Sequence, residues 1–338
     1  MIGEPLGARL SRRALSFSGY GLLFVVLVGL SPALFAVALL VDVWRRSRLA
    51  RVRTLAMAIC YLSCELLGLA AAGLLWLRGG EREAFLDRNF RLQAWWAGTL
   101  FALARRLFSF DVDVEGASLC TPGPVVILIR HVSVADTLLP VALLSRPFGV
   151  RLRYVLKREL LWDPCLDVVG NRLPNAFVRR GGGDTAREAE TVGSLLVGLG
   201  PRDGVLIFPE GTRATPERRR RVLAELAAST SANPELVARA QRLRHLLPPR
   251  LGGLASLLDG TREAPTDVVF VGHCGFEGIR SWADMTSGAL VGRRIRIKLW
   301  RHSAAALPPD RDARLRWVLD EWQRLDDWID GQLATAPA

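Results

Sequence analysis

The chain has 338 residues, 50% of them hydrophobic, and a formal net charge of +12. Its five cysteines are odd in number and form no Cys-x-x-Cys pair, so we expect neither a disulfide framework nor a zinc site. The basic residues are nearly all arginine, and no RNA-recognition, zinc-finger or helix-turn-helix signature accompanies them, so we expect no nucleic-acid partner.

The N-terminal part of the sequence predicts a membrane anchor. Residues 19–41 carry no charge and are long enough to cross a bilayer core, which needs about 20 residues. A cleaved signal peptide has a shorter apolar core with small residues after it, whereas Asp42, Trp44 and several arginines follow here. We therefore expect an uncleaved anchor, kinked at Pro32.

A second apolar stretch covers residues 54–77 and is interrupted by Glu65. It follows five arginines between residues 44 and 53, which is typical of the cytoplasmic side of a membrane. The stretch either crosses the membrane or dips into one leaflet, and the arginine loop and Glu65 favour the second. The prediction is an anchor over residues 1–83 with one or two apolar helices, in the cytoplasmic membrane, with the following domain on the cytoplasmic side.

Residues 84–110 are predicted to form a helix with a wide apolar face on which tryptophans and arginines are mixed. Tryptophan and arginine both suit a membrane interface, so this helix either lies on the membrane or begins the core of a domain. A later helix, at residues 310–330, carries three tryptophans for which core packing is the expected role and an anchor at the membrane interface is the alternative.

From residue 111 onward, short apolar runs alternate with helical stretches. The predicted strands are residues 125–129, 152–156, 205–208, 267–271 and 294–300. The predicted helices are residues 134–145, 184–199, 216–229, 234–246, 251–259 and 310–330. The last strand alternates as an edge strand does. This pattern predicts an α/β domain over residues 84–330, with a mainly parallel sheet flanked by helices and preceded by the membrane-anchoring helical segment; residues 331–338 are expected to be a disordered tail.

His131 and Asp136 lie five positions apart, directly after the strand at 125–129. If the turn folds the Asp136 carboxylate onto one ring nitrogen of His131, the other nitrogen is free to accept a proton, as a general base does. The alternative is an unrelated histidine and aspartate that serve packing and solvation.

Two further segments follow predicted strands. In Val205–Arg213, Gly211 permits a tight turn with exposed backbone N–H groups, and Thr212 and Arg213 can bind phosphate oxygens, although strands also end in Pro-Gly turns without any ligand. Residues 175–183 contain a short predicted strand at 177–178, then Arg179 and Arg180 as a cationic rim and three glycines; a solvated basic turn is the alternative.

Taken in order, His-x-x-x-x-Asp, Phe-Val-Arg-Arg and Phe-Pro-Glu-Gly-Thr-Arg resemble the glycerolipid acyltransferase family, the 1-acylglycerol-3-phosphate acyltransferases and their relatives, over about residues 85–300. Residues 243–253 resemble a Pro-Arg segment of the longer members, those similar to lysocardiolipin acyltransferase. Two departures stand out. Arg130 replaces the asparagine that usually precedes the histidine, and Gly272 and His273 stand where the family's fourth motif usually has a proline.

The resemblance implies that His131, supported by Asp136, removes the proton from the hydroxyl of a lysophospholipid, which then attacks the thioester of acyl-CoA. It also implies that the acceptor phosphate is bound by Arg179 or Arg180 together with the Glu210–Arg213 turn, in which Glu210 orders the loop or contacts the acceptor's glycerol. Acyl-CoA is then a co-substrate, with no further cofactor and no metal.

The most direct acceptor is lysophosphatidic acid, which would be converted to phosphatidic acid. Lysocardiolipin, another lysolipid or glycerol-3-phosphate are alternative acceptors, and acyl-carrier protein is an alternative donor. A phosphatase or esterase is disfavoured, because no Gly-x-Ser-x-Gly or His-Glu-x-x-His motif is present. A non-catalytic membrane protein that binds anionic lipid is the remaining alternative; the acyl-chain length and the oligomeric state are left open.

Overall fold

The computed structural model describes residues 4–178, 185–228 and 234–335. The chain divides into two compact units. The first comprises Met1–Asp111, Leu138–Gly182 and Ser281–Arg293, and the second comprises Val112–Thr137, Gly183–Arg280 and Arg294–Ala338. The N-terminal helices therefore share a unit with residues beyond 137, and this division crosses the boundary that we predicted at residue 83.

The first unit begins with four helices, α1 (Leu6–Gly29), α2 (Ser31–Arg45), α3 (Ala50–Arg78) and α4 (Arg82–Phe108). The apolar stretch at 19–41 is divided between α1 and α2, because Pro32 sits in the first turn of α2, where its missing N–H is tolerated. In the described residues, α1 and α3 are the helices long and apolar enough to cross a membrane, a property that suggests membrane association by length and composition alone.

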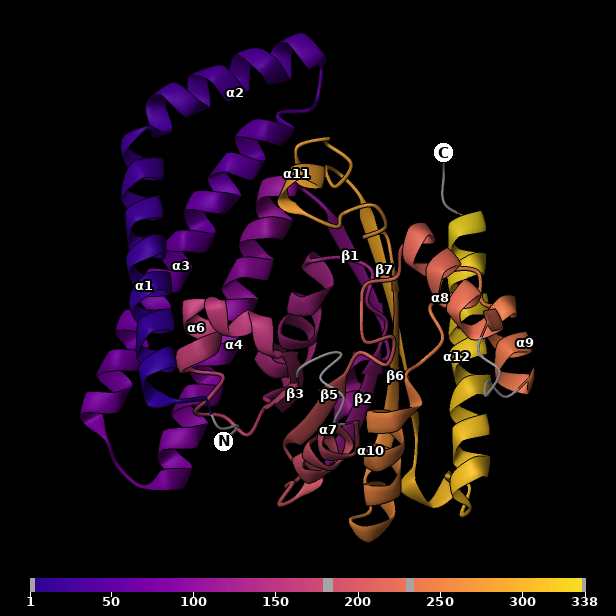
Figure 1. The fold of residues 1–338 in the computed structure, drawn as a ribbon. Coiled ribbons are helices and arrows are strands. Elements are labelled where there is room, and N and C mark those ends of the chain that lie inside the picture. Colours follow the sequence, from indigo (N-terminus) through magenta and orange to yellow (C-terminus); the bar gives the residue numbers. More distant parts are fainter. Residues whose placement is uncertain (1–3, 179–184, 229–233, 336–338) are drawn as a thin grey trace. The chain divides into compact units, whose positions relative to one another are not determined.

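Helix α3 packs against α1, α2 and α4 (Figure 1), and its buried residues are mostly apolar or small but include the acidic Glu65. Glu65 is fully buried there, and its two carboxylate oxygens accept hydrogen bonds from Trp96 Nε1 at 2.8 Å and from the backbone N–H of Cys165 at 3.0 Å. These partners satisfy an acidic group that would be costly to expose to lipid. Helix α4 buries the face that contains Phe90, Leu100 and Phe108 within this unit, as a core helix does.

The rest of the first unit is built from short elements. They are η3 (Val141–Ser145), α5 (Arg146–Phe148), β3 (Arg151–Lys157), η4 (Arg158–Trp162), α6 (Pro164–Val168), β4 (Ala176–Val178) and α11 (Trp282–Met285). Strands β3 and β4 are parallel, and β4 includes the short strand predicted at 177–178. The single helix predicted at 134–145 is instead a 3₁₀ turn, η2 (Ala135–Leu138), followed by the π-helical η3, because Pro140 lacks the N–H that a continuous helix needs.

The second unit is built on neighbouring strands in the order β1 (Asp111–Glu115), β7 (Arg294–His302), β6 (Asp267–Cys274), β2 (Val125–Ile129) and β5 (Asp203–Ile207). Strand β2 pairs in parallel with β5 and β6, with Val126 opposite Val205 and Val268. Strand β7 is antiparallel to β6 and lies between it and β1, so the prediction that β7 is an edge strand was wrong. The described strands are mainly parallel and flanked by helices, which confirms the predicted fold class.

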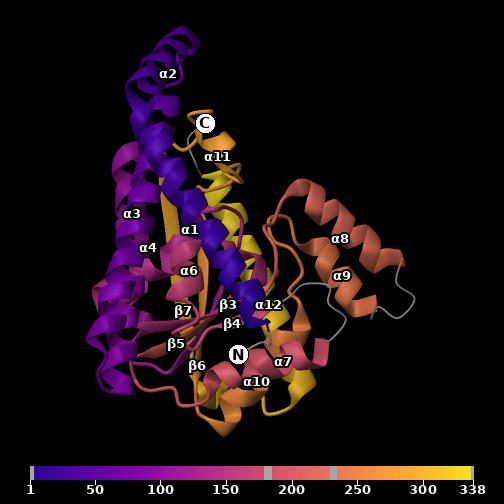
Figure 2. The ribbon, with the colours of Figure 1, turned by 60° about the vertical axis from the view of Figure 1, so that its left-hand side comes forward.

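Among the described residues, the second unit also contains the helices α7 (Thr185–Gly193), α8 (Pro216–Ala228), α9 (Pro234–Arg242), α10 (Leu251–Glu263) and α12 (Arg311–Ala334). Short 3₁₀ turns η1 (Ala117–Cys120), η5 (Ser194–Leu196) and η6 (Ala304–Ala306) complete the unit. Helices α7 and α10 pack together, α12 packs on β6, and α8 lies beside α9 (Figure 2). Helix α12 continues to Ala334, four residues past its predicted end.

Helix α9 ends at Arg242, although the sequence predicts a helix to residue 246. Residues 244–246 direct their backbone N–H groups to the carboxylate of Asp326 on α12 instead of along a helix. The central strands β2 and β5 are buried along their whole length, which is why continuous apolar runs predicted them well.

Candidate active site

The candidate site lies at the carboxyl end of β2, the strand between β5 and β6. Arg130 and His131 follow the last strand residue, Ile129. In open α/β sheets, ligands bind at the carboxyl ends of the parallel strands. The same end of the neighbouring β5 leads into Phe208 and the turn at Glu210–Arg213, so two of the predicted segments meet in this unit.

The turn after β2 folds Asp136 back onto His131. The His131 Nδ1 atom lies 2.8 Å from Asp136 Oδ1. The other carboxylate oxygen, Oδ2, accepts the backbone N–H groups of Val132 at 2.6 Å and of Ser133 at 2.7 Å. The residues that separate the pair in sequence therefore hold the carboxylate in place, and this is the arrangement that the five-residue spacing predicted.

The electrostatics of the pair suit a general base. Burial opposes ionisation of Asp136, but His131 and the backbone N–H donors outweigh it and hold the pKa of Asp136 below its usual value. An ionised Asp136 stabilises a proton on His131 Nδ1 and leaves Nε2 as the free acceptor. The His131 side chain is 13% exposed, and its ring lies 4.6 Å from the Phe208 ring between centroids.

Glu210 is 2% exposed and joins two segments of backbone. Its Oε2 accepts the N–H of His131 at 2.6 Å, and its Oε1 accepts the N–H of Leu247 at 3.0 Å. Burial raises the pKa of Glu210 to about 8, although both hydrogen bonds and the charge of Arg130 act in the opposite direction. These contacts are those of a residue that orders the loop, the first of the two roles expected for it.

The turn after Glu210 depends on Gly211. This glycine has φ +66° and donates its N–H to the carbonyl of Phe208 at 2.9 Å. Thr212 is half-buried, and Arg213 donates from Nη1 to the carbonyl of Arg280. The N–H of Ala214 bonds to the carbonyl of His131 at 2.7 Å, so the end of this turn lies against the histidine. The other two predicted site residues, Arg179 and Arg180, lie outside the described residues.

Residues that the sequence alone did not assign complete the surroundings of the pair. Arg130, 1% exposed, donates from Nη1 to the carbonyl of His273 at 2.7 Å and to Glu277 Oε1 at 2.9 Å. His273 is fully buried with its Nε2 3.7 Å from Asp136 Oδ2, and burial lowers its pKa to about 4. An arginine directly after a buried strand indicates a buried positive charge, which needs an acidic side chain to pair with. Nothing in the sequence identifies Glu277 as that side chain.

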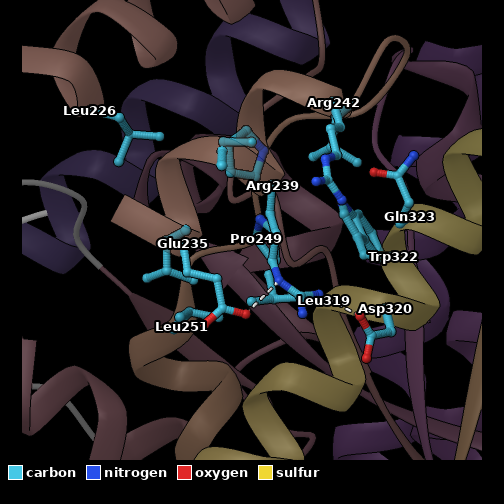
Figure 3. Close-up of a pocket in the computed structure, with 15 residues that line it drawn as sticks. Leu226, Glu235, Arg239, Arg242, Pro249, Leu251, Leu319, Asp320, Trp322 and Gln323 are labelled. Carbon is cyan, nitrogen blue, oxygen red and sulfur yellow. Dashed lines mark hydrogen bonds and ion pairs between the residues drawn. The ribbon is translucent and has the colours of Figure 1, made fainter. Parts of the chain in front are cut away.

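A cavity of about 450 Å³ lies in the same unit, between α9, residues 248–251 and α12 (Figure 3). Its wall is largely apolar and includes Trp322, while Arg239 at the rim pairs with Glu235 at 3.0 Å and with Asp320. None of the predicted site residues that the structure describes lines this cavity. Among the described residues, no group of three or more histidine, cysteine or acidic side chains is arranged to hold a metal ion.

Comparison with known proteins agrees with this geometry. The protein-family model described as Acyltransferase matches residues 111–250. The crystal structure of the 1-acyl-sn-glycerophosphate (LPA) acyltransferase PlsC from Thermotoga maritima is similar in fold, with a TM-score of 0.53 and 14% sequence identity. The similarity covers 86% of this chain and 99% of that one. No curated protein matches the sequence. Residues 111–250 thus match the Acyltransferase family model, the chain shares the fold of PlsC, and both findings support the resemblance to the glycerolipid acyltransferases.

Proposed function

We propose that the protein transfers a fatty acyl group from acyl-CoA to the free hydroxyl of a lysophospholipid, with lysophosphatidic acid as the acceptor and phosphatidic acid as the product. One observation carries the proposal. His131 Nδ1 is held at 2.8 Å by a buried carboxylate, which leaves Nε2 free to act as a base, and the Gly211–Arg213 turn ends beside the backbone of His131. The acyltransferase family and the fold similarity support the same class of reaction.

The reaction needs no group beyond the two substrates and these side chains. His131 Nε2 accepts the proton of the acceptor hydroxyl, whose oxygen bonds to the thioester carbon. The carbon–sulfur bond then breaks, and the CoA sulfur takes the proton back from the imidazolium. Asp136 stabilises the imidazolium while it carries that proton. General base catalysis of this kind contributes about 10²–10⁴-fold, and positioning of the two substrates supplies much of the rest.

The acceptor phosphate is assigned to the turn after β5, where Gly211 permits the tight turn and the side chains of Thr212 and Arg213 supply donors. Arg179 and Arg180 are proposed to contribute further positive charge. Both the acceptor and the acyl chain partition into membranes. We therefore place the protein at the cytoplasmic membrane through its apolar helices, with the catalytic residues on the cytoplasmic side.

An acyl-transfer assay tests the proposal. The full chain, purified in detergent, receives radiolabelled oleoyl-CoA with lysophosphatidic acid, lysocardiolipin, lysophosphatidylcholine or glycerol-3-phosphate, and His131→Ala is assayed in parallel. We expect labelled phosphatidic acid from the wild type and none from the variant, with circular dichroism showing that both are folded. Transfer to another acceptor keeps the mechanism and changes the substrate. No transfer from acyl-CoA or acyl-carrier protein would exclude the proposed enzyme.

A further inference from the structure

Residues 244–247, between α9 and α10, have no regular secondary structure and are held by α12. The carboxylate of Asp326 accepts three consecutive backbone N–H groups, from Arg244 at 2.7 Å, His245 at 2.8 Å and Leu246 at 2.9 Å. Asp326 is itself only 1% exposed. A buried carboxylate that receives several backbone donors is a strong anchor, since charge-assisted hydrogen bonds are stronger than neutral ones.

Leu247, the residue after the three that Asp326 binds, connects this segment to the candidate active site. Trp322 Nε1, one helical turn before Asp326, donates to the carbonyl of Leu247 at 2.9 Å. The N–H of Leu247 donates to Glu210 Oε1 at 3.0 Å, and the other oxygen of Glu210 accepts the N–H of His131 at 2.6 Å. A short series of hydrogen bonds therefore leads from α12 to the backbone of His131.

A second contact leads from the same segment to the residue before the histidine. The Nη2 atom of Arg130 donates to the carbonyl of His245 at 3.4 Å, while Nη1 binds the carbonyl of His273. If Asp326 lost its charge, three backbone N–H donors would lose a strong acceptor, and residues 244–247 would be free to shift. The hydrogen-bond partners of Glu210 and Arg130 would then move with them.

We propose that Asp326 is a positioning residue for the acyl transfer, acting through residues 244–247 and Glu210 on the orientation of His131; this inference rests on the proposed function. Asp326 touches none of the reacting groups. It also lies outside residues 111–250, the part of the chain that matches the family model. The C-terminal helix thereby becomes part of what holds the catalytic histidine in place.

The kinetic test compares Asp326→Asn with Asp327→Asn. Asp327 is exposed on the same helix, and its Oδ1 accepts only from Gln323 at 2.9 Å among the contacts of the described residues. We expect Asp326→Asn to lower kcat about tenfold while KM for both substrates stays within about twofold, because positioning acts on the chemical step. Asp327→Asn should match the wild type. Equal kcat in all three proteins would overturn the inference.

A double variant separates positioning from general loss of stability. If Asp326 acts through Glu210, Asp326→Asn combined with Glu210→Gln should lose little more than Glu210→Gln alone, since coupled residues are not additive. Independent, multiplicative losses would contradict this route. If Asp326→Asn does not fold, Trp322→Phe keeps an aromatic ring there and removes the Nε1 bond to Leu247. It should lower kcat about threefold, and an unchanged kcat would count against the proposal.

A spectroscopic readout does not depend on activity. The chain has four histidines, so NMR of ring-¹³C-labelled histidine gives few signals, and His131→Ala identifies that of His131. Asp326→Asn should shift the His131 signal, and Asp327→Asn should leave it in place. If the wild-type protein transfers no acyl group but Asp326→Asn still shifts the His131 signal, the structural link is supported although the proposed function fails. An unmoved signal would overturn the link itself.

Discussion

At the scale of single residues, Asp136 performs two tasks with two oxygens. One oxygen binds His131 Nδ1, and the other binds the backbone N–H groups of Val132 and Ser133, so the residue that orients the base also shapes the turn that presents it. A change that preserves shape but removes the negative charge separates these tasks.

Asp136→Asn is predicted to lower kcat about 10²–10⁴-fold, the usual contribution of a general base, because an asparagine cannot stabilise the imidazolium by charge. The measurement is kcat at saturating acyl-CoA and lysophosphatidic acid. Thr137→Ala is the matched control, since its hydroxyl donates to the carbonyl of Val134 at 2.8 Å on the exposed side of the same turn. A kcat for Asp136→Asn within about threefold of the control would refute the base assignment.

His273 predicts a pH dependence of stability. Its pKa of about 4 lies below the ordinary value of about 6.5 because burial disfavours the charged ring, so between these values the unfolded chain binds a proton that the folded protein does not. This contribution to stability is fully present above about pH 6.5 and is lost as the pH falls towards 4, by on the order of 3 kcal/mol.

Urea unfolding of wild type and His273→Gln at about pH 7 and about pH 4.5 tests this prediction. From about pH 7 to about pH 4.5, the unfolding free energy of the wild type should fall by about 2–3 kcal/mol more than that of the variant. Glu210, whose pKa is raised to about 8, contributes stability that is present below its unfolded value and lost as the pH rises through 8. That opposite trend is common to both proteins and cancels in the difference. Equal losses would mean that His273 protonates freely in the folded state.

At the scale of elements, the turn after β5 depends on Gly211. An added Cβ would lie 2.8 Å from Arg250 Cδ, and the backbone has φ +66°. Gly198 has the same φ of +66°, and a Cβ added there would meet no other atom within 4 Å, so it isolates the cost of backbone strain from that of displaced neighbours.

Both Gly198→Ala and Gly211→Ala are predicted to cost about 1 kcal/mol of unfolding free energy, because alanine is strained at this φ. Only Gly211→Ala should also raise KM for the acceptor, by about threefold or more, since displacing Arg250 moves the turn proposed to bind phosphate. Urea unfolding measures the change in unfolding free energy, and initial rates measure KM for the acceptor. If both variants keep the wild-type KM, the turn does not bind the acceptor.

At the scale of the whole molecule, the membrane is the partner that the N-terminal helices suit best. Helix α1 exposes Leu22 at 66%, Leu23 at 52% and Val25 at 66%. Replacing all three with serine removes about 1–2 kcal/mol of apolar transfer free energy per residue, so co-sedimentation with anionic vesicles should fall markedly. Val197→Ser, at a residue 75% exposed in the second unit, should sediment like the wild type. Unchanged sedimentation of the triple variant would show that α1 is not the membrane contact.

The sequence by itself determined the fold class, the central strands and the spacing of the base and its carboxylate. Strands β2, β5 and β6 are buried on both faces, so continuous apolar runs mark them, and the turn from His131 to Asp136 is closed by atoms within six residues of chain. These features are local, and local patterns of hydrophobicity and hydrogen bonding follow directly from the order of residues.

Only the tertiary structure decided what depends on distant partners. Strand β1 carries three acidic residues in five positions and forms beside β7, which moves β7 away from the edge of the sheet. Arg130 forms an ion pair with Glu277 and a hydrogen bond to the carbonyl of His273. Asp326 accepts hydrogen bonds from residues 244–246, some 80 positions earlier in the chain. A buried charge needs a partner, but packing alone decides which one it meets, because many residues of suitable charge are available along the chain.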